Sequence, residues 1–160
     1  MQKEQIDTAS KALDRVLPTI KDTQSLLNLT DQLYQYHMDE SAKQALDRAI
    51  KIAKDETALI KLSNYFINKG KTDEATNAIN AAIRKTRTKD KLLKLIKFAA
   101  QHKMEDTLNQ GIEKLPKMTQ SLEDYFQVSD YLLKQQRVEQ SSRIIDMGIK
   151  SIPSKYRSNT

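Results

Sequence analysis

Residues 59–83 read L-I-K-L-S-N-Y-F-I-N-K-G-K-T-D-E-A-T-N-A-I-N-A-A-I, and this stretch predicts the fold of the whole chain. Its first half carries large apolar residues three and four positions apart, at Leu59, Leu62 and Phe66, which places them on one face of a helix. Its second half repeats this spacing with smaller side chains. We therefore expect two amphipathic helices joined by a tight turn at Gly70.

The same pattern recurs every 33 residues, for example at positions 46, 79 and 112. One set of equivalent positions holds only branched aliphatic residues: Leu13, Leu46, Ile79, Ile112 and Ile145. Neither helix of a unit can bury its apolar face alone, so the units must stack and share a continuous core. We predict a single array with a half repeat at 4–22, repeats at 23–55, 56–88, 89–121 and 122–154, and a polar tail at 155–160.

Local sequence features indicate where individual helices end and begin. Pro116 should end the second helix of the third repeat early, since proline cannot continue a helix, and leave Lys117 to Gln120 as an irregular connection. Ser121 and Asp124 have the spacing of a helix-capping box. Acidic residues recur where each second helix begins, which is typical of helix starts; they are Glu40, Asp73, Asp106 and Glu139.

Composition agrees with an all-α protein. The 160 residues include only three glycines and three prolines, too few for most β-rich folds or phosphate-binding loops. The chain has no cysteine, which excludes disulfides and thiolate chemistry, and its formal net charge of +6 favours acidic partners. We expect no transmembrane segment. The expected compartment is the cytoplasm, and a soluble domain of a longer or membrane-anchored protein is the alternative.

These equivalent positions resemble the tetratricopeptide repeat family. The residues that carry the resemblance, at small positions within each helix pair and at the terminal proline, are Ala42, Ala75, Thr30, Ser63, Ser129 and Pro153. The resemblance implies a right-handed α-solenoid of antiparallel helix pairs, about nine helices in all. The repeat departs from the family in its period, which is 33 where 34 is usual, and in having no tryptophan.

The resemblance also implies a non-enzymatic scaffold or adaptor with no cofactor, whose concave face is lined by the first helix of each repeat. The apolar candidates for contact with a protein or peptide partner are Leu27, Ile60, Leu93, Phe126, Tyr34, Ile67 and Leu133. The polar candidates are Lys61, Asn64, Lys94 and Lys97. An apolar strip edged with polar groups is typical of a groove for a peptide or an amphipathic helix. The alternative is that the curvature of the array buries these residues as ordinary core.

A basic cluster falls where the second and third repeats meet. It comprises Arg84, Lys85, Arg87, Lys89, Lys91, Lys94, Lys97 and Lys103. These side chains could bind an acidic peptide, nucleic-acid phosphates or anionic lipid. The alternative is a set of cations at a helix C-terminus beside a solvated face. An RNA-binding helical repeat is the less favoured reading, because bases need planar side chains interleaved with the charge.

Other classes of function find little support. The sequence contains no metal-protease, hydrolase or phosphate-loop motif, so neither a catalytic nor a metal site is expected. Both histidines, His37 and His102, fall at expected turns. A carboxylate clamp of this family would need lysine and asparagine on the matching faces of the first helices. Those faces carry Leu27, Asp31, Ile60 and Asp130, which argues against that clamp.

The last helix, expected from Glu139 to Ser151, predicts an uncovered end of the array. Its apolar residues, which include Met147 and Ile149, spread over more than one face. A homo-oligomer that assembles through the solenoid ends is therefore the alternative function.

Overall fold

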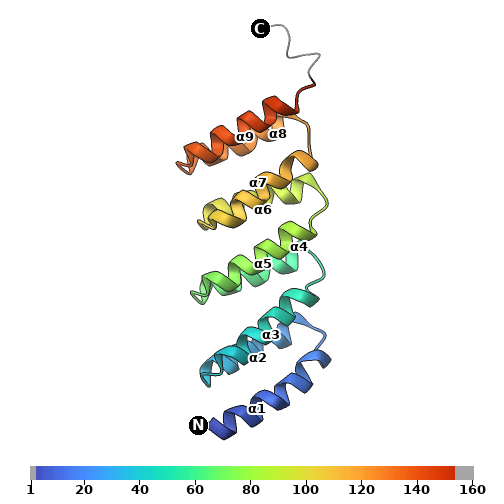
Figure 1. The fold of residues 1–160 in the computed structure, drawn as a ribbon, viewed down its shortest axis with the longest axis vertical. Helices are drawn as coiled ribbons and strands as arrows, with labels where there is room; N and C mark the ends of the chain where they lie inside the picture. Colours follow the sequence, from blue (N-terminus) through green and yellow to red (C-terminus); the bar gives the residue numbers. More distant parts are fainter. Residues whose placement is uncertain (1–2, 154–160) are drawn as a thin grey trace.

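The computed structural model describes residues 3–153. The helices, in order, are α1 (Lys3–Val16), η1 (Leu17–Thr19), α2 (Thr23–Gln35), α3 (Asp39–Ile52), α4 (Glu56–Asn68), α5 (Thr72–Lys85), α6 (Lys89–Gln101), α7 (Glu105–Lys114), η2 (Leu115–Lys117), α8 (Leu122–Lys134) and α9 (Val138–Ser151). No strand occurs in this part of the chain. Figure 1 shows the helices stacked along one long axis.

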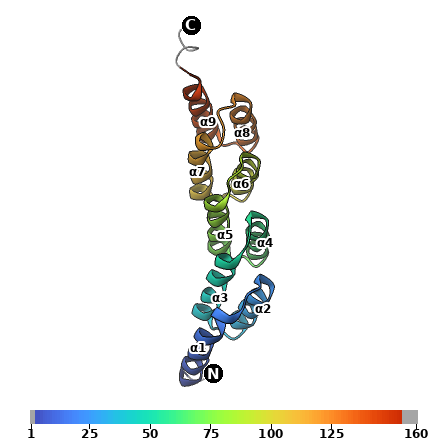
Figure 2. The same ribbon diagram turned by 90° about the vertical axis from the view of Figure 1, so that its right-hand side faces the viewer.

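The helices form two layers. Figure 2 places α2, α4, α6 and α8 side by side in one layer, and α1, α3, α5, α7 and α9 in the other. Each helix of the first layer packs against the helix that follows it in the chain, across a short turn. The predicted all-α solenoid of helix pairs is confirmed. Among residues 3–153 no helix has the length and apolarity needed to cross a bilayer.

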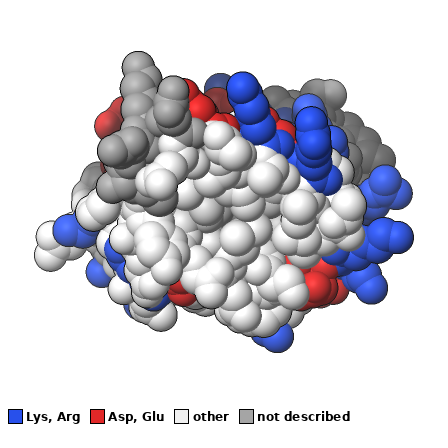
Figure 3. All heavy atoms as spheres, turned by 90° about the horizontal axis from the view of Figure 1, so that it is seen from below, with Lys and Arg blue, Asp and Glu red and all other residues white. Residues whose placement is uncertain are grey.

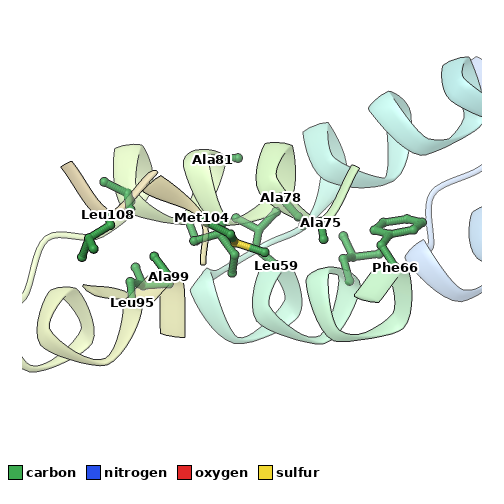
Figure 4. Packing of buried hydrophobic residues seen from close by; sticks show 14 of the residues in the cluster. Leu59, Phe66, Ala75, Ala78, Ala81, Leu95, Ala99, Met104 and Leu108 are labelled. Carbon is green, nitrogen blue, oxygen red and sulfur yellow. The ribbon is translucent and has the colours of Figure 1, made fainter. Parts of the chain in front are cut away.

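The core lies between the two layers. Figure 4 shows Leu59 and Phe66 of α4 against Ala75 and Ala78 of α5, and all four are at most 1% exposed. Large side chains on one helix and small ones on the other let the two helices approach closely and interlock. One connected cluster of buried residues runs from Leu17 to Ile144, so the units share a single core.

Each helix pair turns through a residue with positive φ. These residues are spaced by one period of the array: His37 (57°), Gly70 (69°), Lys103 (56°) and Gln136 (59°). In every case the next amide donates to a carbonyl five residues earlier, as from Met38 to Leu33 at 2.9 Å. This arrangement is the Schellman motif, which usually places glycine at the positive-φ position. Here three of the four turns hold a left-handed conformation without glycine.

The third helix pair is shorter, as predicted. Helix α7 ends at Lys114, and Pro116 lies in the 3₁₀ turn η2 that follows. The predicted capping box is wrong, since the Ser121 side chain makes no capping hydrogen bond. The Asp124 carboxylate instead accepts hydrogen bonds from Lys89 and Thr119. A hydrogen bond from a lysine ammonium group is stronger than one from a neutral backbone amide, so the Asp124 carboxylate pairs with Lys89 instead of capping the helix.

Two ion pairs connect neighbouring helices of the first layer. Lys91 of α6 lies 2.9 Å from Glu56 of α4, and Lys89 of α6 lies 3.0 Å from Asp124 of α8. Positions 56 and 91 lie one period before positions 89 and 124, so the two pairs occupy equivalent sites with their charges exchanged. Both carboxylates are buried. We call each such pair a polar seal of its seam, where a seam is the junction between two successive helices of the first layer.

The seals lower the pKa values of both carboxyl groups. The hydrogen bond from Lys91 is the main cause for Glu56. Burial alone would raise the pKa of Asp124, but the hydrogen bonds from Thr119 and Lys89 outweigh it, so the net shift is downward.

The turns predict opposite effects of glycine at two equivalent positions. Lys103→Gly should raise the free energy of unfolding by roughly 0.5–1 kcal/mol, because glycine adopts positive φ without strain. Gly70→Ala should lower it by about 1 kcal/mol; no atom lies within 4 Å of the new Cβ, so the cost is backbone strain alone. Urea unfolding followed by far-UV circular dichroism measures both. A shift of the same sign in both variants would contradict this account of the turns.

The seals predict that stability falls in acid. Because the folded-state pKa values of Glu56 and Asp124 lie below those of the unfolded chain, their contribution is complete above about pH 4.3, the ordinary pKa of glutamate. It is lost as the pH falls through the lower folded-state values. Urea midpoints measured across this range should decline more steeply for the wild type than for Glu56→Gln. Equal slopes would show that the Glu56 seal contributes nothing to folding.

Candidate functional site

A pocket of about 610 Å³ lies at one end of the seam between α2 and α4. We call it the α2/α4 pocket. Its walls come from the first half of α2, the end of α3, the connections before α2 and α4, and α4 as far as Tyr65. The lining residues are Lys21, Asp22, Thr23, Gln24, Leu27, Ile52, Lys54, Asp55, Thr57, Ala58, Lys61, Leu62 and Tyr65. Two of the predicted contact residues, Leu27 and Lys61, are therefore brought together at one site.

The pocket lies where a polar seal is missing. Thr23 and Ala58 occupy the positions that are equivalent to Glu56 and Lys91 in the next seam, and both line the pocket. Thr119, whose hydroxyl donates to Asp124 in the α6/α8 seam, corresponds to Ala53 here. Neither threonine nor alanine can fill this space or bridge the two helices as a lysine–carboxylate pair does. The α2/α4 seam is thus open at the place where the other two seams are closed.

A second, smaller pocket of about 290 Å³ lies at the other end of the same seam. Its lining residues are Asp31, Tyr34, Gln35, Tyr65, Phe66, Lys69 and Lys71. Lys69 lies 3.3 Å from Asp31, and the Lys71 ammonium group lies 3.9 Å from the centre of the Tyr34 ring. Tyr34, another predicted contact residue, donates a hydrogen bond to Glu74 at 3.0 Å. Burial, together with that hydrogen bond, raises the pKa of Tyr34 to about 12, so it stays a neutral donor.

Tyr65 lines both pockets, and its hydroxyl is buried without a hydrogen-bond partner. At the equivalent place in the α6/α8 seam, the Tyr131 hydroxyl donates to the Lys97 carbonyl at 3.3 Å. Burial and the nearby Asp31 carboxylate raise the pKa of Tyr65. The α2/α4 seam therefore lacks the tyrosine-to-carbonyl hydrogen bond of the α6/α8 seam, and at this end it is linked instead by the Lys69–Asp31 ion pair.

The remaining apolar candidates differ in exposure. Leu27 and Leu93 are only 9% and 8% exposed, and Ile60, Ile67 and Tyr34 are partly buried against the core. Phe126 and Leu133 of α8 are 53% and 51% exposed. No further helix follows α8 in the first layer of the described chain, so nothing there covers these two residues. The predicted residues do not form one continuous exposed strip, because inner members also serve as core between neighbouring units.

The polar candidates lie on the surface of the first layer. Lys61, Asn64 and Lys94 are exposed. Lys97 is partly buried, and its ammonium group lies 5.6 Å from the centre of the Tyr131 ring.

Half of the basic cluster has an internal role. Lys89 and Lys91 form the seals, Lys85 donates to the Ala53 carbonyl at 2.8 Å, and Lys97 contacts Tyr131. The other four side chains make no ion pair within residues 3–153; they are Arg84, Arg87, Lys94 and Lys103. Seen along the long axis from the α1 end (Figure 3), Lys and Arg side chains project mainly on the side where Figure 1 places the connections between units.

Sequence reasoning missed Thr23, Ala58 and Tyr65 as site residues. A signal for the first two was present: residues 56 and 91, and residues 89 and 124, pair opposite charges, whereas the equivalent residues 23 and 58 do not. The unpartnered hydroxyl of Tyr65 had no signal in the sequence.

The histidines lie at turns, as predicted. His37 is the positive-φ residue of the first turn, and the His102 ring packs 4.4 Å from that of Phe98, centre to centre. Within the described residues no group of three or more His, Asp or Glu side chains could hold a metal ion.

No family model matches the chain, and no curated protein matches it. Among solved structures, the chain is similar to the crystal structure of MamA, with 16% identity, 97% of this chain and 93% of that chain covered, and a TM-score of 0.38. A similarity at this level carries no argument about function. The chain is an all-α array of stacked helix pairs, and its membership in the tetratricopeptide family stays a prediction from its residues.

Proposed function

We propose that this protein is a non-enzymatic interaction module that binds a peptide or an amphipathic helix along the first layer, formed by α2, α4, α6 and α8. The observation that carries the proposal is the open α2/α4 seam. It joins the predicted contacts Leu27 and Lys61 in one pocket whose size falls within the range of about 300–1,000 Å³ typical of ligand sites.

The lining supports this proposal. Leu27, Ile52 and Leu62 supply an apolar floor, while lysine, threonine and glutamine side chains surround it. Apolar anchors give affinity and the polar rim gives orientation, which is the usual division in peptide recognition.

The fold supports it as well. Both helices that form the seam are fixed by fully buried residues, Leu26 in α2 and Leu59 in α4. A partner would therefore meet a preformed surface and lose little free energy in ordering it.

A specific observation favours self-association as a second candidate function. Ile149 of α9 is 50% exposed, whereas the equivalent residues Leu17 and Ile83 are 6% and 3% exposed. Phe126 and Leu133 of α8 are exposed as well, so the last helix pair carries three exposed apolar side chains. We call these three residues the C-terminal face. A second copy of the chain could cover it.

Selection from a library of displayed short peptides tests the main proposal. Peptides should be enriched on the wild type, and Lys61→Glu should weaken their binding by about tenfold or more, because it reverses a charge at the pocket rim. Lys43→Glu on α3 is the matched control: Lys43 is also an exposed lysine, but it lies in the other layer. Equal losses in both variants, or no enrichment at all, would contradict the proposal.

Sedimentation velocity tests self-association. The wild type should show a mass that rises with concentration, and Phe126→Glu combined with Leu133→Glu should abolish the rise, because two buried charges oppose an apolar contact. Val16→Glu is the control at the other end of the array, where Val16 is also 50% exposed. A single monomeric species at high micromolar concentration would exclude this candidate.

A further inference from the structure

Unpaired lysine side chains line the open α2/α4 seam. Lys21, Lys54 and Lys61 line the α2/α4 pocket, and none of them forms an ion pair in the described part of the chain. The lining also contains two carboxylates, Asp22 and Asp55, and both accept hydrogen bonds from backbone amides of the chain.

Both carboxylates cap helix starts. Asp22 accepts the Ser25 amide at 2.7 Å, and Asp55 accepts the Ala58 amide at 2.9 Å. These hydrogen bonds orient each carboxylate toward its own helix, whose N-terminal dipole also stabilises the negative charge. The three ammonium groups therefore remain available to an external anion.

The unpaired cations continue beyond the pocket in two rows with the period of the array. One row holds Lys21, Lys54 and Arg87, and the other holds Lys61 and Lys94; neighbours in each row are one repeat apart. Because equivalent residues stack along the solenoid axis, the rows lead from the α2/α4 pocket to the next seam.

The chemistry of the occupant follows from the apolar floor of the pocket and from the rows of unpaired cations beside it. We propose that the α2/α4 pocket receives a large apolar side chain of an acidic peptide segment, whose flanking carboxylates lie against the two rows of cations. This inference rests on the proposed function and names the class of partner that the first layer accepts. An apolar anchor between acidic residues satisfies the apolar floor and the uncompensated ammonium groups together.

A nucleic acid fits this site less well. Stable single-strand binding uses several aromatic side chains on which bases stack, and the pocket lining contains one aromatic residue, Tyr65. The apolar floor also offers nothing to phosphates.

The first experiment uses a defined probe. The probe is a fluorescein-labelled peptide with one phenylalanine between two pairs of glutamates, measured by fluorescence polarisation with the full chain. It should bind saturably and more weakly at higher salt. Replacing its phenylalanine with serine, or its glutamates with glutamines, should weaken binding by about tenfold or more. No saturable binding up to millimolar protein would overturn the inference, as would equal binding of all three peptides.

The second experiment closes the pocket. Thr23→Glu combined with Ala58→Lys introduces the seal of the next seam and leaves the net charge unchanged. It should abolish probe binding while the thermal midpoint stays the same or rises. The matched control is Asn77→Glu combined with Gln44→Lys. It introduces the same two charged residues at exposed positions of the other layer, one repeat apart, and should leave binding unchanged. Probe binding that survives in the closed variant would overturn the inference.

A charge exchange keeps the test decisive if the closed variant does not fold. Lys54→Glu combined with Lys61→Glu alters only exposed side chains, and it should shift preference from the glutamate-flanked probe to the same peptide with lysines. Unchanged preference would overturn the inference.

The two proposals fail separately. If displayed peptides are enriched on the wild type and lose binding in the closed variant, but show no preference for an apolar residue between acidic ones, the inference is wrong and the interaction module stands. If no peptide is enriched, both are wrong.

Discussion

The packing of large side chains from one layer against small side chains from the other is the constraint on which this molecule depends. Leu59 and Phe66 meet Ala75 and Ala78 with almost no exposed surface. The first unit has the same arrangement, with Leu26 and Leu33 on α2 and Ala42 and Ala45 on α3, all of them buried. Because the buried positions recur at a constant interval, the helices stack in a fixed register. The positive-φ turns recur with the same period, and each reverses the chain within a few residues. His37, Lys103 and Gln136 hold this left-handed conformation although they are not glycines.

The same register makes departures from the repeat informative. Where equivalent positions hold opposite charges, the seam closes around a buried carboxylate, as at Glu56 and Asp124. Where they hold Thr23 and Ala58, the seam stays open and a pocket forms. A buried ion pair is a weak source of net stability, because desolvation offsets much of the attraction. The missing seal therefore costs the fold little, and this makes it a place where a surface for a partner can arise without loss of the array.

Exposure along the array follows the same logic. Residues that pack against the next unit are buried inside the stack and uncovered in the last helix pair, which is why Ile149 is exposed and Ile83 is not. The basic cluster divides in a similar way. Lys89 and Lys91 hold neighbouring units together, and Arg87 and Lys94 lack such partners. Basic residues of one cluster in the sequence thus have two roles, and only the contacts in the folded chain show which residue has which role.

The amino-acid sequence was enough to predict the helix pairs, their stacking and a continuous shared core, because the spacing of apolar residues such as Leu59, Leu62 and Phe66 reflects local helix geometry. It also indicated the early end of α7 at Pro116. Packing in three dimensions was needed to tell which apolar residues face a neighbour and which face solvent: Leu93 and Phe126 are equivalent in sequence yet differ from 8% to 53% in exposure. The α2/α4 pocket likewise became visible only in the folded chain. A pocket is space left between side chains of different units, and its existence depends on pairs such as residues 23 and 58 that lie far apart in the chain, so no local pattern specifies it.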